Sequence, residues 1–278
     1  MVNFDKQPVE FYGEAVADKT ARSVRSLMES ERCPFLDKRC VKQRKSDPTQ
    51  TIGSCTVGYQ GGPLIICPHR FLERHQIFLD CVPLLAPNLR YLIVPEVAMP
   101  GGSVDYFVVA VDDSNEVLDY VGLEIQSLDT TGSGGIWKAR QDLLRGELKP
   151  SYPYGINWRM SAKTILVQMH HKAAAFEALG KRLILVVQDK FLAYIAREFQ
   201  TDRLQVARDE DPVRFHVYDA VLLGSQLRVV LSDQKSTDML GVERMLSSGQ
   251  DPEVLEEEVV ARVKAKMPRA IELQIPPN

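Results

Sequence analysis

The residues with the clearest potential for chemistry are three polar side chains within two apolar segments. Asp105 lies in V-D-Y-F-V-V-A-V, and Glu124 and Gln126 lie in V-G-L-E-I-Q-S-L. Carboxylate oxygens are the ligands that Mg²⁺ uses in proteins, and a bound Mg²⁺ also takes phosphate oxygens and water. An amide has no useful pKa, so Gln126 can orient a reactant but cannot act as a general base.

A hairpin would bring these three residues together. The two apolar runs flank D-D-S-N, which predicts an antiparallel hairpin with Ser114 and Asn115 at its tip. In that register Asp105 directly opposes Glu124. Side-chain alternation then places Asp105, Glu124 and Gln126 on one face of the sheet. The opposite face is expected to carry Val104, Tyr106, Leu123 and Ile125.

Two opposed carboxylates need a positive partner. Directly opposed side chains are only about 5 Å apart at Cβ, and like charges at that distance destabilise a sheet. A divalent cation held by Asp105 and Glu124 would remove this repulsion. The alternative is a pair of ordinary acids near a hairpin, because a register slip of one residue would send them to opposite faces. Glu96, in V-P-E-V before the hairpin, is either a further carboxylate of the site or the cap of a neighbouring turn.

Cysteines cluster near the N-terminus, in a segment rich in turn residues. Thiolates on tight turns are the ligands of tetrahedral Zn or Fe sites, and four of them would leave no open position, as in a structural site. The spacing fits no standard zinc-finger pattern, so buried and inert thiols are the alternative. Cys81, in I-F-L-D-C-V-P-L-L, is expected to pack in the core. The clustered residues are Cys33, Cys40, Cys55 and Cys67.

Charge is distributed unevenly, although the net charge of the chain is only -3. A basic segment near the cysteines is either a surface for a polyanion such as DNA or a solvated loop. Its members are Lys38, Arg39, Lys42, Arg44 and Lys45. The N-terminus lacks the apolar core of a signal peptide, and there is no run of about 18 apolar residues to cross a membrane. We therefore expect a cytoplasmic protein with no membrane partner and no disulfides.

The hydrophobic pattern predicts an α/β fold in two parts. Residues 1–83 would form an N-terminal helix and an irregular cysteine module punctuated by Pro and Gly. Residues 84–278 would form the larger domain, in which short apolar strands precede a helix over residues 161–179. R-L-I-L-V-V-Q then predicts a buried central strand, followed by a helix from Asp189. This order predicts a mixed β-sheet flanked by helices.

Two sets of motifs resemble known nucleases. An acid on one strand, followed on the next by E-x-K or a variant, resembles the PD-(D/E)XK nuclease superfamily, although Val104 replaces the proline and Gln126 the lysine of that motif. Longer segments are similar to the NotI family of type II restriction endonucleases, over roughly residues 30 to 195. They are C-P-F-L-D-K-R-C, G-S-C-T-V, I-I-C-P-H-R, V-D-Y-F, G-L-E-I-Q and N-W-R-M-S-A-K-T-I-L-V-Q-M-H-H-K.

This resemblance implies a PD-(D/E)XK nuclease core in a homodimeric, Mg²⁺-dependent enzyme that cuts both strands of a GC-rich palindromic site in double-stranded DNA. Asp105 and Glu124 would bind Mg²⁺, and Gln126 would orient the attacking water or polarise the scissile phosphate. The four clustered cysteines would bind a structural metal, which is iron in that family. A restriction endonuclease also implies a cognate DNA methyltransferase in the same cell.

Residues after the hairpin are further candidates for contact with DNA. Arg159 and Lys163 lie near the start of the predicted helix, where they would face either the duplex or solvent. His170 and His171 are adjacent on that helix and cannot face the same way, so a structural or DNA-proximal role is favoured over catalysis. The loop T-T-G-S-G-G lacks the P-loop pattern, which argues against an NTPase.

Three other functions fit parts of the sequence. A PD-(D/E)XK nuclease of repair or defence, with little sequence preference, would use the same carboxylates. A DNA-binding protein with a decayed nuclease site is disfavoured because all three motif positions carry the residues such a site needs. An enzyme acting on small phosphoesters is disfavoured by the basic segment and the cysteine module.

Overall fold

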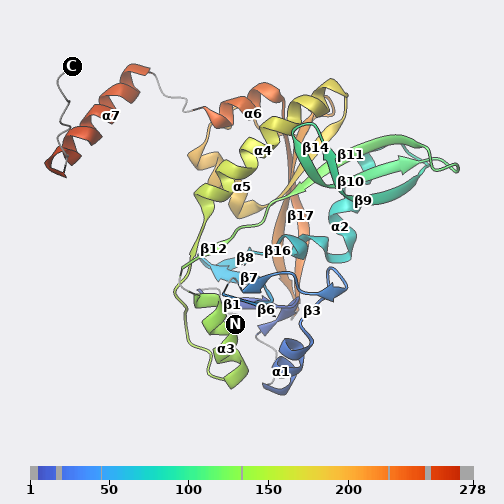
Figure 1. Ribbon diagram of the computed structural model, residues 1–278. Helices are drawn as coiled ribbons and strands as arrows, with labels where there is room; N and C mark the ends of the chain where they lie inside the picture. The colour runs from blue at the N-terminus through green and yellow to red at the C-terminus, as the bar shows by residue number, and fades with distance from the viewer. Residues whose placement is uncertain are drawn as a thin grey trace, which may run out of the picture.

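The computed structural model describes residues 6–16, 21–44, 46–132, 134–224, 226–247 and 252–269. Within these residues the main element is a seven-stranded sheet in the order β15-β17-β16-β14-β11-β10-β9 (Figure 1). β14 pairs in parallel with β11 and β16, and the other neighbours are antiparallel. The strands are β9 (Arg90–Met99), β10 (Gly102–Val111), β11 (Val117–Ile125), β14 (Arg182–Gln188), β15 (Gln205–Val206), β16 (Val213–Leu223) and β17 (Gln226–Thr237).

Helices flank both faces of this sheet. Leu166, Phe191 and Val242 bring α4, α5 and α6 into a core on one face. Phe71 and Phe78 bring η2 and α2 into a second core on the other face. The mixed sheet flanked by helices that the sequence predicts is therefore confirmed. The helices of this part of the chain are η2 (Pro68–His75), α2 (Gln76–Leu79), η3 (Val82–Leu84), α3 (Gly135–Arg145), α4 (Trp158–Ala178), α5 (Asp189–Glu198) and α6 (Met239–Leu246), followed by α7 (Pro252–Lys266) and η4 (Met267–Arg269).

Strand β14 lies between the two cores. Leu183, Leu185 and Val187 belong to the core beneath α4, α5 and α6. Ile184 and Val186 belong to the core beneath η2 and α2. A strand buried on both faces has a continuous apolar sequence, which confirms the prediction made for R-L-I-L-V-V-Q.

The N-terminal unit, residues 6–83, contains its own sheet. Its described strands form a four-stranded sheet in the order β2-β1-β7-β8, and two short hairpins, β3-β4 and β5-β6, carry the basic segment. The elements are β1 (Pro8–Phe11), β2 (Glu14–Ala15), α1 (Ala21–Ser30), β3 (Arg32–Cys33), β4 (Lys38–Arg39), β5 (Gln43–Arg44), β6 (Asp47–Thr51), β7 (Ser54–Tyr59) and β8 (Gly62–Ile65).

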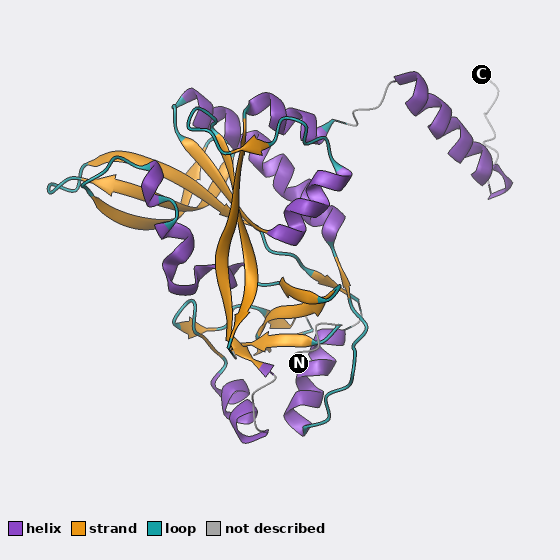
Figure 2. Ribbon diagram, turned by 180° about the vertical axis from the view of Figure 1, so that it is seen from behind, coloured by secondary structure: helices purple, strands orange, loops and turns teal. Residues whose placement is uncertain are grey.

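This unit packs tightly against the rest of the chain. Val57 and Leu64 belong to the same core as α4 and the main sheet. Leu143 of α3 packs in turn with Phe11 and Tyr12 of the N-terminal unit. Figure 2 shows the longest strands of the main sheet extending down towards the N-terminal sheet. The division at residue 83 remains a prediction, and side chains from both sides of it share these cores.

The remaining short strands, β12 (Thr130–Thr131) and β13 (Gly155–Ile156), pair with each other in an antiparallel ladder. Among the helices of the described ranges, none has the length and apolar character needed to cross a membrane.

Candidate active site

The β10-β11 hairpin has the predicted register. Tyr106 pairs with Leu123, and the same register continues as far as Ala110 and Asp119, after which it shifts by one residue so that Val111 pairs with Val117. The paired residues begin at Tyr106, so the direct opposition of Asp105 and Glu124 remains a prediction that extends this register by one residue. The two acids are nevertheless neighbours, because the charge of Asp105 acts on the Glu124 carboxyl.

The strand is irregular at Asp105 itself. The Asp105 carboxylate accepts a hydrogen bond from the backbone N–H of Ile125 at 2.8 Å. A Cβ atom on Gly122 would lie 3.3 Å from Val104 Cγ1, so Val104 lies on the same face as Gly122 and Glu124. The prediction that Val104 lies on the face opposite to Glu124 is thus wrong, because side chains do not alternate regularly through Asp105.

Glu124 is buried and paired with a lysine. Lys172 Nζ donates hydrogen bonds to Glu124 Oε1 at 2.5 Å and to the Ser103 carbonyl at 2.6 Å. Both Glu124 and Lys172 are only 3% exposed. Burial raises the pKa of Glu124 to about 7, the hydrogen bond from Lys172 opposes this rise, and the charge of Asp105 adds to it. In this structure the Lys172 ammonium therefore supplies a positive charge to Glu124.

Lys172 lies outside the set of site residues predicted above, although its helix carries a signal for it. Ile165, Met169 and Phe176 of α4 are buried, and Lys172 occupies the same helical stripe. A cation within an otherwise apolar stripe needs a buried acid as its partner. That pattern could have identified Lys172 as a partner of an acid on the sheet.

Gln126 directly follows β11 and is half-buried. Its backbone N–H donates to the Val186 carbonyl at 3.0 Å, which extends the pairing of β11 with β14. Its side-chain amide donates to the carbonyl of Ser127. The second N–H and the oxygen of this amide have no partner in the described part of the chain.

Glu96 lies on the other side of Asp105. Val97 pairs with Val104, so the next position of the β9-β10 register places Glu96 opposite Asp105. Glu96 is exposed and has a φ of 52°, in the left-handed region that few non-glycine residues adopt. Burial raises the pKa of the Tyr106 phenol, and Asp105 and Glu96 both add to that rise. Acids therefore outnumber cations at this end of the hairpin.

His69 and Lys38 bring the N-terminal unit close to Asp105. Burial lowers the pKa of the His69 imidazole, Lys38 lowers it further, and Asp105 acts in the opposite direction. His69 belongs to the motif I-I-C-P-H-R, which was singled out for its cysteine and not for this histidine. The charges of Lys38, on β4, and of Asp105, on β10, therefore both act on His69.

The clustered cysteines are buried and influence one another. The pKa of the Cys40 thiol is raised by burial and by Cys33, and that of Cys67 is raised by burial, Cys40 and Cys33. The backbone N–H groups of Lys42 and His69 form hydrogen bonds that favour the thiolates of Cys40 and Cys67, respectively. Burial also raises the pKa of Cys55, and Cys67 adds to the effect. Cys81 is buried in the core, as predicted.

The basic side chains have different partners. Arg39 is paired with Glu31, whose carboxylate is 2.6 Å from the guanidinium. Lys42 Nζ donates to the Ile66 carbonyl at 2.5 Å. Arg44 lies over the ring of Trp137, with 4.6 Å between its Cζ and the ring centroid. Lys38 lies on β4 and is exposed, and Lys45 falls outside the described residues.

The helical candidates lie on α4. Arg159 and Lys163 are exposed on its first turns. His170 is half-buried and its Nδ1 has no hydrogen-bond partner among the described residues. His171 is exposed, with 5.9 Å between the centroids of the two imidazole rings. These side chains are not part of the Glu124–Lys172 pair, so a catalytic role for either histidine gains no support.

The donor types in both places fit the predicted metals. Asp105 and Glu124 offer the oxygen ligands of a hard cation, and the cysteines offer the sulfur ligands of Zn or Fe. Within the described ranges, no group of three or more His, Cys, Asp or Glu side chains is arranged closely enough to hold a metal ion. A carboxylate has two oxygens, so Glu124 can retain Lys172 with one and offer the other.

No family model and no curated protein matches this chain. The assignment of a function therefore depends on the side chains described here and on the resemblance of the motifs.

Proposed function

We propose that this protein is a Mg²⁺-dependent, site-specific endonuclease that hydrolyses phosphodiester bonds in double-stranded, GC-rich DNA, as type II restriction endonucleases of the PD-(D/E)XK superfamily do. The observation that carries the proposal is the pair of neighbouring acids, Asp105 and Glu124, beside a buried Lys172. One ammonium cannot neutralise both carboxylates together with the neighbouring Glu96. The excess of acid favours the binding of a divalent cation.

Each polar residue of the site would have a separate role in hydrolysis. Asp105 and Glu124 would hold the cation, which when bound offsets charge on the phosphate and lowers the pKa of a water molecule. Lys172 positions Glu124, since it holds one carboxylate oxygen while anchored to the Ser103 carbonyl. Lys172 would supply the ammonium group of the PD-(D/E)XK lysine, whose position in this chain is occupied by Gln126. Gln126 would then act as a neutral donor that orients water or phosphate.

DNA would be held mainly through its phosphates. Lys38, Lys42 and Arg44 lie on or beside the two short hairpins of the N-terminal unit, and the charges of Lys38 and Asp105 both act on His69. Arg39 would contribute less because Glu31 already binds it. A homodimer and a cognate methyltransferase are carried into this proposal from the resemblance alone.

The four buried thiols would bind a structural Fe or Zn ion in the mature protein. The N–H groups directed at Cys40 and Cys67 support this, because such hydrogen bonds favour the thiolate over the thiol. Elemental analysis of purified protein is expected to give about one metal ion per chain. Absence of stoichiometric iron and zinc would remove this part of the proposal.

The proposal is tested by incubating purified protein with a large GC-rich DNA in Mg²⁺, with an EDTA control. We expect discrete fragments that appear only with Mg²⁺, and sequencing of their ends would give the recognition site. A smear would favour a nuclease with little sequence preference, which would use the same residues. Intact DNA together with a gel shift would favour a DNA-binding protein with a decayed site.

A further inference from the structure

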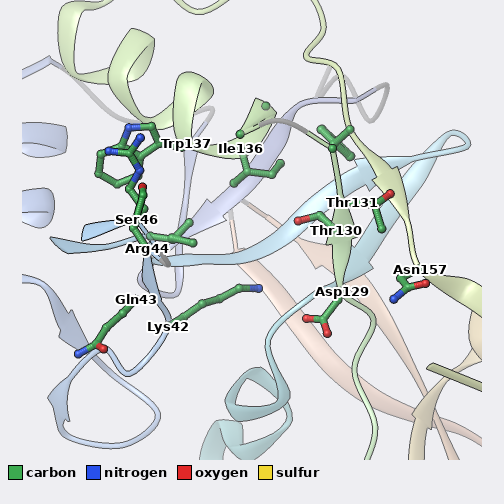
Figure 3. Close-up of a pocket in the computed structure, with 15 residues that line it drawn as sticks. Lys42, Gln43, Arg44, Ser46, Asp129, Thr130, Thr131, Ile136, Trp137 and Asn157 are labelled. Atoms are coloured by element: carbon green, nitrogen blue, oxygen red, sulfur yellow. The ribbon is translucent and has the colours of Figure 1, made fainter. Parts of the chain in front are cut away.

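A second site is a cavity of about 800 Å³. One wall contains Lys42, Arg44 and Ser46, and the other contains residues 129–132 and 134–137. Figure 3 shows Arg44 against Trp137 on one side and Asp129 and Thr130 on the other, with the ammonium end of Lys42 extending between them. A cavity of this size accommodates a ligand of nucleotide dimensions.

One wall offers a flat, cationic surface. The guanidinium of Arg44 lies 4.6 Å from the centroid of the Trp137 ring, and Arg140 lies 5.1 Å from the same centroid. Trp137 therefore holds Arg44 in a defined orientation. Guanidinium planes backed in this way are surfaces on which nucleobases stack, and Arg and Lys also bind phosphate.

The other wall offers polar groups that the fold does not use. In the described part of the chain, the Asp129 carboxylate has no hydrogen bond or ion pair, although the Asp129 carbonyl accepts the N–H of Asn157 at 2.9 Å. Asn157 precedes α4 at the capping position, yet its side chain makes no capping hydrogen bond. A carboxylate that only accepts hydrogen bonds selects a ligand edge with two adjacent N–H donors, as on guanine.

We propose that this cavity binds a single guanine nucleotide. The base stacks on Arg44, its N1–H and N2–H groups donate to Asp129, and its phosphate lies near Lys42. Adenine places an acceptor where guanine has the N1–H donor, so it repels the Asp129 carboxylate. The same chemistry is present in a free guanine nucleotide and in an unpaired guanine of a DNA strand.

If the bound guanine belongs to a DNA strand, the cavity is part of the DNA-cleaving site, and this form of the inference rests on the proposed function. Asp129 lies three residues after Gln126, so their Cα atoms are at most about 11 Å apart, roughly three base steps of duplex DNA. A guanine displaced from the duplex near the scissile phosphate could therefore reach the cavity. Such a pocket would contribute to selection of a GC-rich site.

Calorimetric titrations of the full chain in EDTA test this inference without any cleavage. The ligands are GMP, AMP, a DNA duplex with one bulged guanine, and the same duplex fully paired. We expect GMP to bind at least about tenfold more tightly than AMP, and Asp129→Asn to remove that preference, because hydrogen bonds to a charged acceptor are stronger than those to a neutral one. Asp113→Asn, at the exposed hairpin tip, is the matched control and should change nothing.

The outcomes separate the two sources. Tighter binding of the bulged duplex than of the paired duplex, by an increment that Asp129→Asn abolishes, supports a guanine from a strand. Tight binding of GMP with no advantage for the bulge supports a free nucleotide. Equal affinities for GMP and AMP, or a preference that survives Asp129→Asn, would overturn the inference. The titrations measure binding in EDTA, where cleavage is suppressed. The GMP and AMP affinities therefore test the cavity even if the protein proves not to be a nuclease.

Discussion

Two buried ion pairs of this protein have similar burial but different surroundings. In the N-terminal unit, Arg70 binds both oxygens of Glu10, at 2.9 and 3.1 Å, and also binds Glu73 at 2.9 Å and the Leu227 carbonyl at 2.8 Å. In the hairpin, Lys172 binds a single oxygen of Glu124 and one carbonyl. Arg70 and Glu10 are 2% and 1% exposed, so burial alone does not distinguish the two pairs.

The balance of charge distinguishes them. Glu73 also binds Arg228, so two acids face two arginines in the N-terminal network. Burial lowers the pKa of Arg70, but Glu10 and Glu73 outweigh this effect and hold the pKa above its ordinary value. At Glu124 the acids are in excess, and the pKa of the carboxyl rises to about 7. A buried ion pair in which every charge has an opposite charge is expected to stabilise the fold. A buried ion pair with an excess of carboxylates can instead bind a further cation or a substrate.

The largest effect on stability is expected for Arg70→Met. This change leaves Glu10 buried without its cation, whereas Glu73 keeps Arg228, and it should lower the free energy of unfolding by about 3–5 kcal/mol. Urea denaturation measures it. Arg32→Met, which removes an exposed partner of Asp37, should cost less than about 1 kcal/mol. Equal losses for the two variants would show that the N-terminal network is not structural.

A buried histidine with no counter-charge should make the protein sensitive to acid. His216 is fully buried, neither ring nitrogen has a hydrogen-bond partner in the described part of the chain, and burial lowers its pKa to about 4, with Arg214 adding to the effect. The folded state keeps this ring neutral, whereas the unfolded state binds a proton below about pH 6.5. The contribution to stability is therefore full above pH 6.5 and is lost as the pH falls towards 4, to a limit of about 3 kcal/mol.

Replacement of His216 tests this directly. The free energy of unfolding of His216→Leu should fall less between pH 6.5 and pH 4 than that of the wild type. Urea denaturation at a series of pH values measures the slope. Parallel slopes for the two proteins would assign acid sensitivity to other groups.

A smaller effect on folding, with a clear effect on cleavage, is expected for Lys172→Met. Glu124 already has a pKa of about 7, so it can take up a proton when its partner is removed, and the loss of stability should be smaller than for Arg70→Met. Cleavage should fall by about 100-fold, because Glu124 loses the group that positions it. The measurement is initial cleavage rate against Mg²⁺ concentration, and Lys172→Arg should restore part of the rate. A Lys172→Met protein with wild-type cleavage would refute the positioning role.

The hairpin was predictable from sequence because its apolar alternation and its turn lie in one short segment of the chain. Alternation of apolar residues on either side of the D-D-S-N turn predicts the register that is observed from Tyr106–Leu123 to Ala110–Asp119, although the register shifts by one residue at Val111, next to the turn. The orientation of Val104 was not predictable in the same way. Asp105 bonds the backbone of Ile125, and Glu96 opposite it has a left-handed φ, so the regular alternation assumed from sequence does not hold there.

The role of Lys172 and the second cavity were not predictable, because both arise from contacts between residues far apart in the sequence. Lys172 reaches Glu124 only because α4 crosses the sheet at that point, and a lysine on a helix more often faces solvent. Arg44 and Trp137 likewise belong to elements far apart in the chain. The sequence indicates the residue types in both cases, but only the packing of the elements shows which of them meet.

The central claim is that Glu124 serves chemistry while the equally buried Glu10 serves structure. Glu124→Gln and Glu10→Gln should therefore be compared side by side for Mg²⁺-dependent cleavage of GC-rich DNA and for unfolding in urea. Glu124→Gln is predicted to stay folded, to bind DNA at least as well and to lose cleavage, with a smaller loss of stability than Glu10→Gln because Lys172 keeps the Ser103 carbonyl as an acceptor. Mg²⁺-dependent cleavage by Glu124→Gln at the wild-type rate would contradict the account.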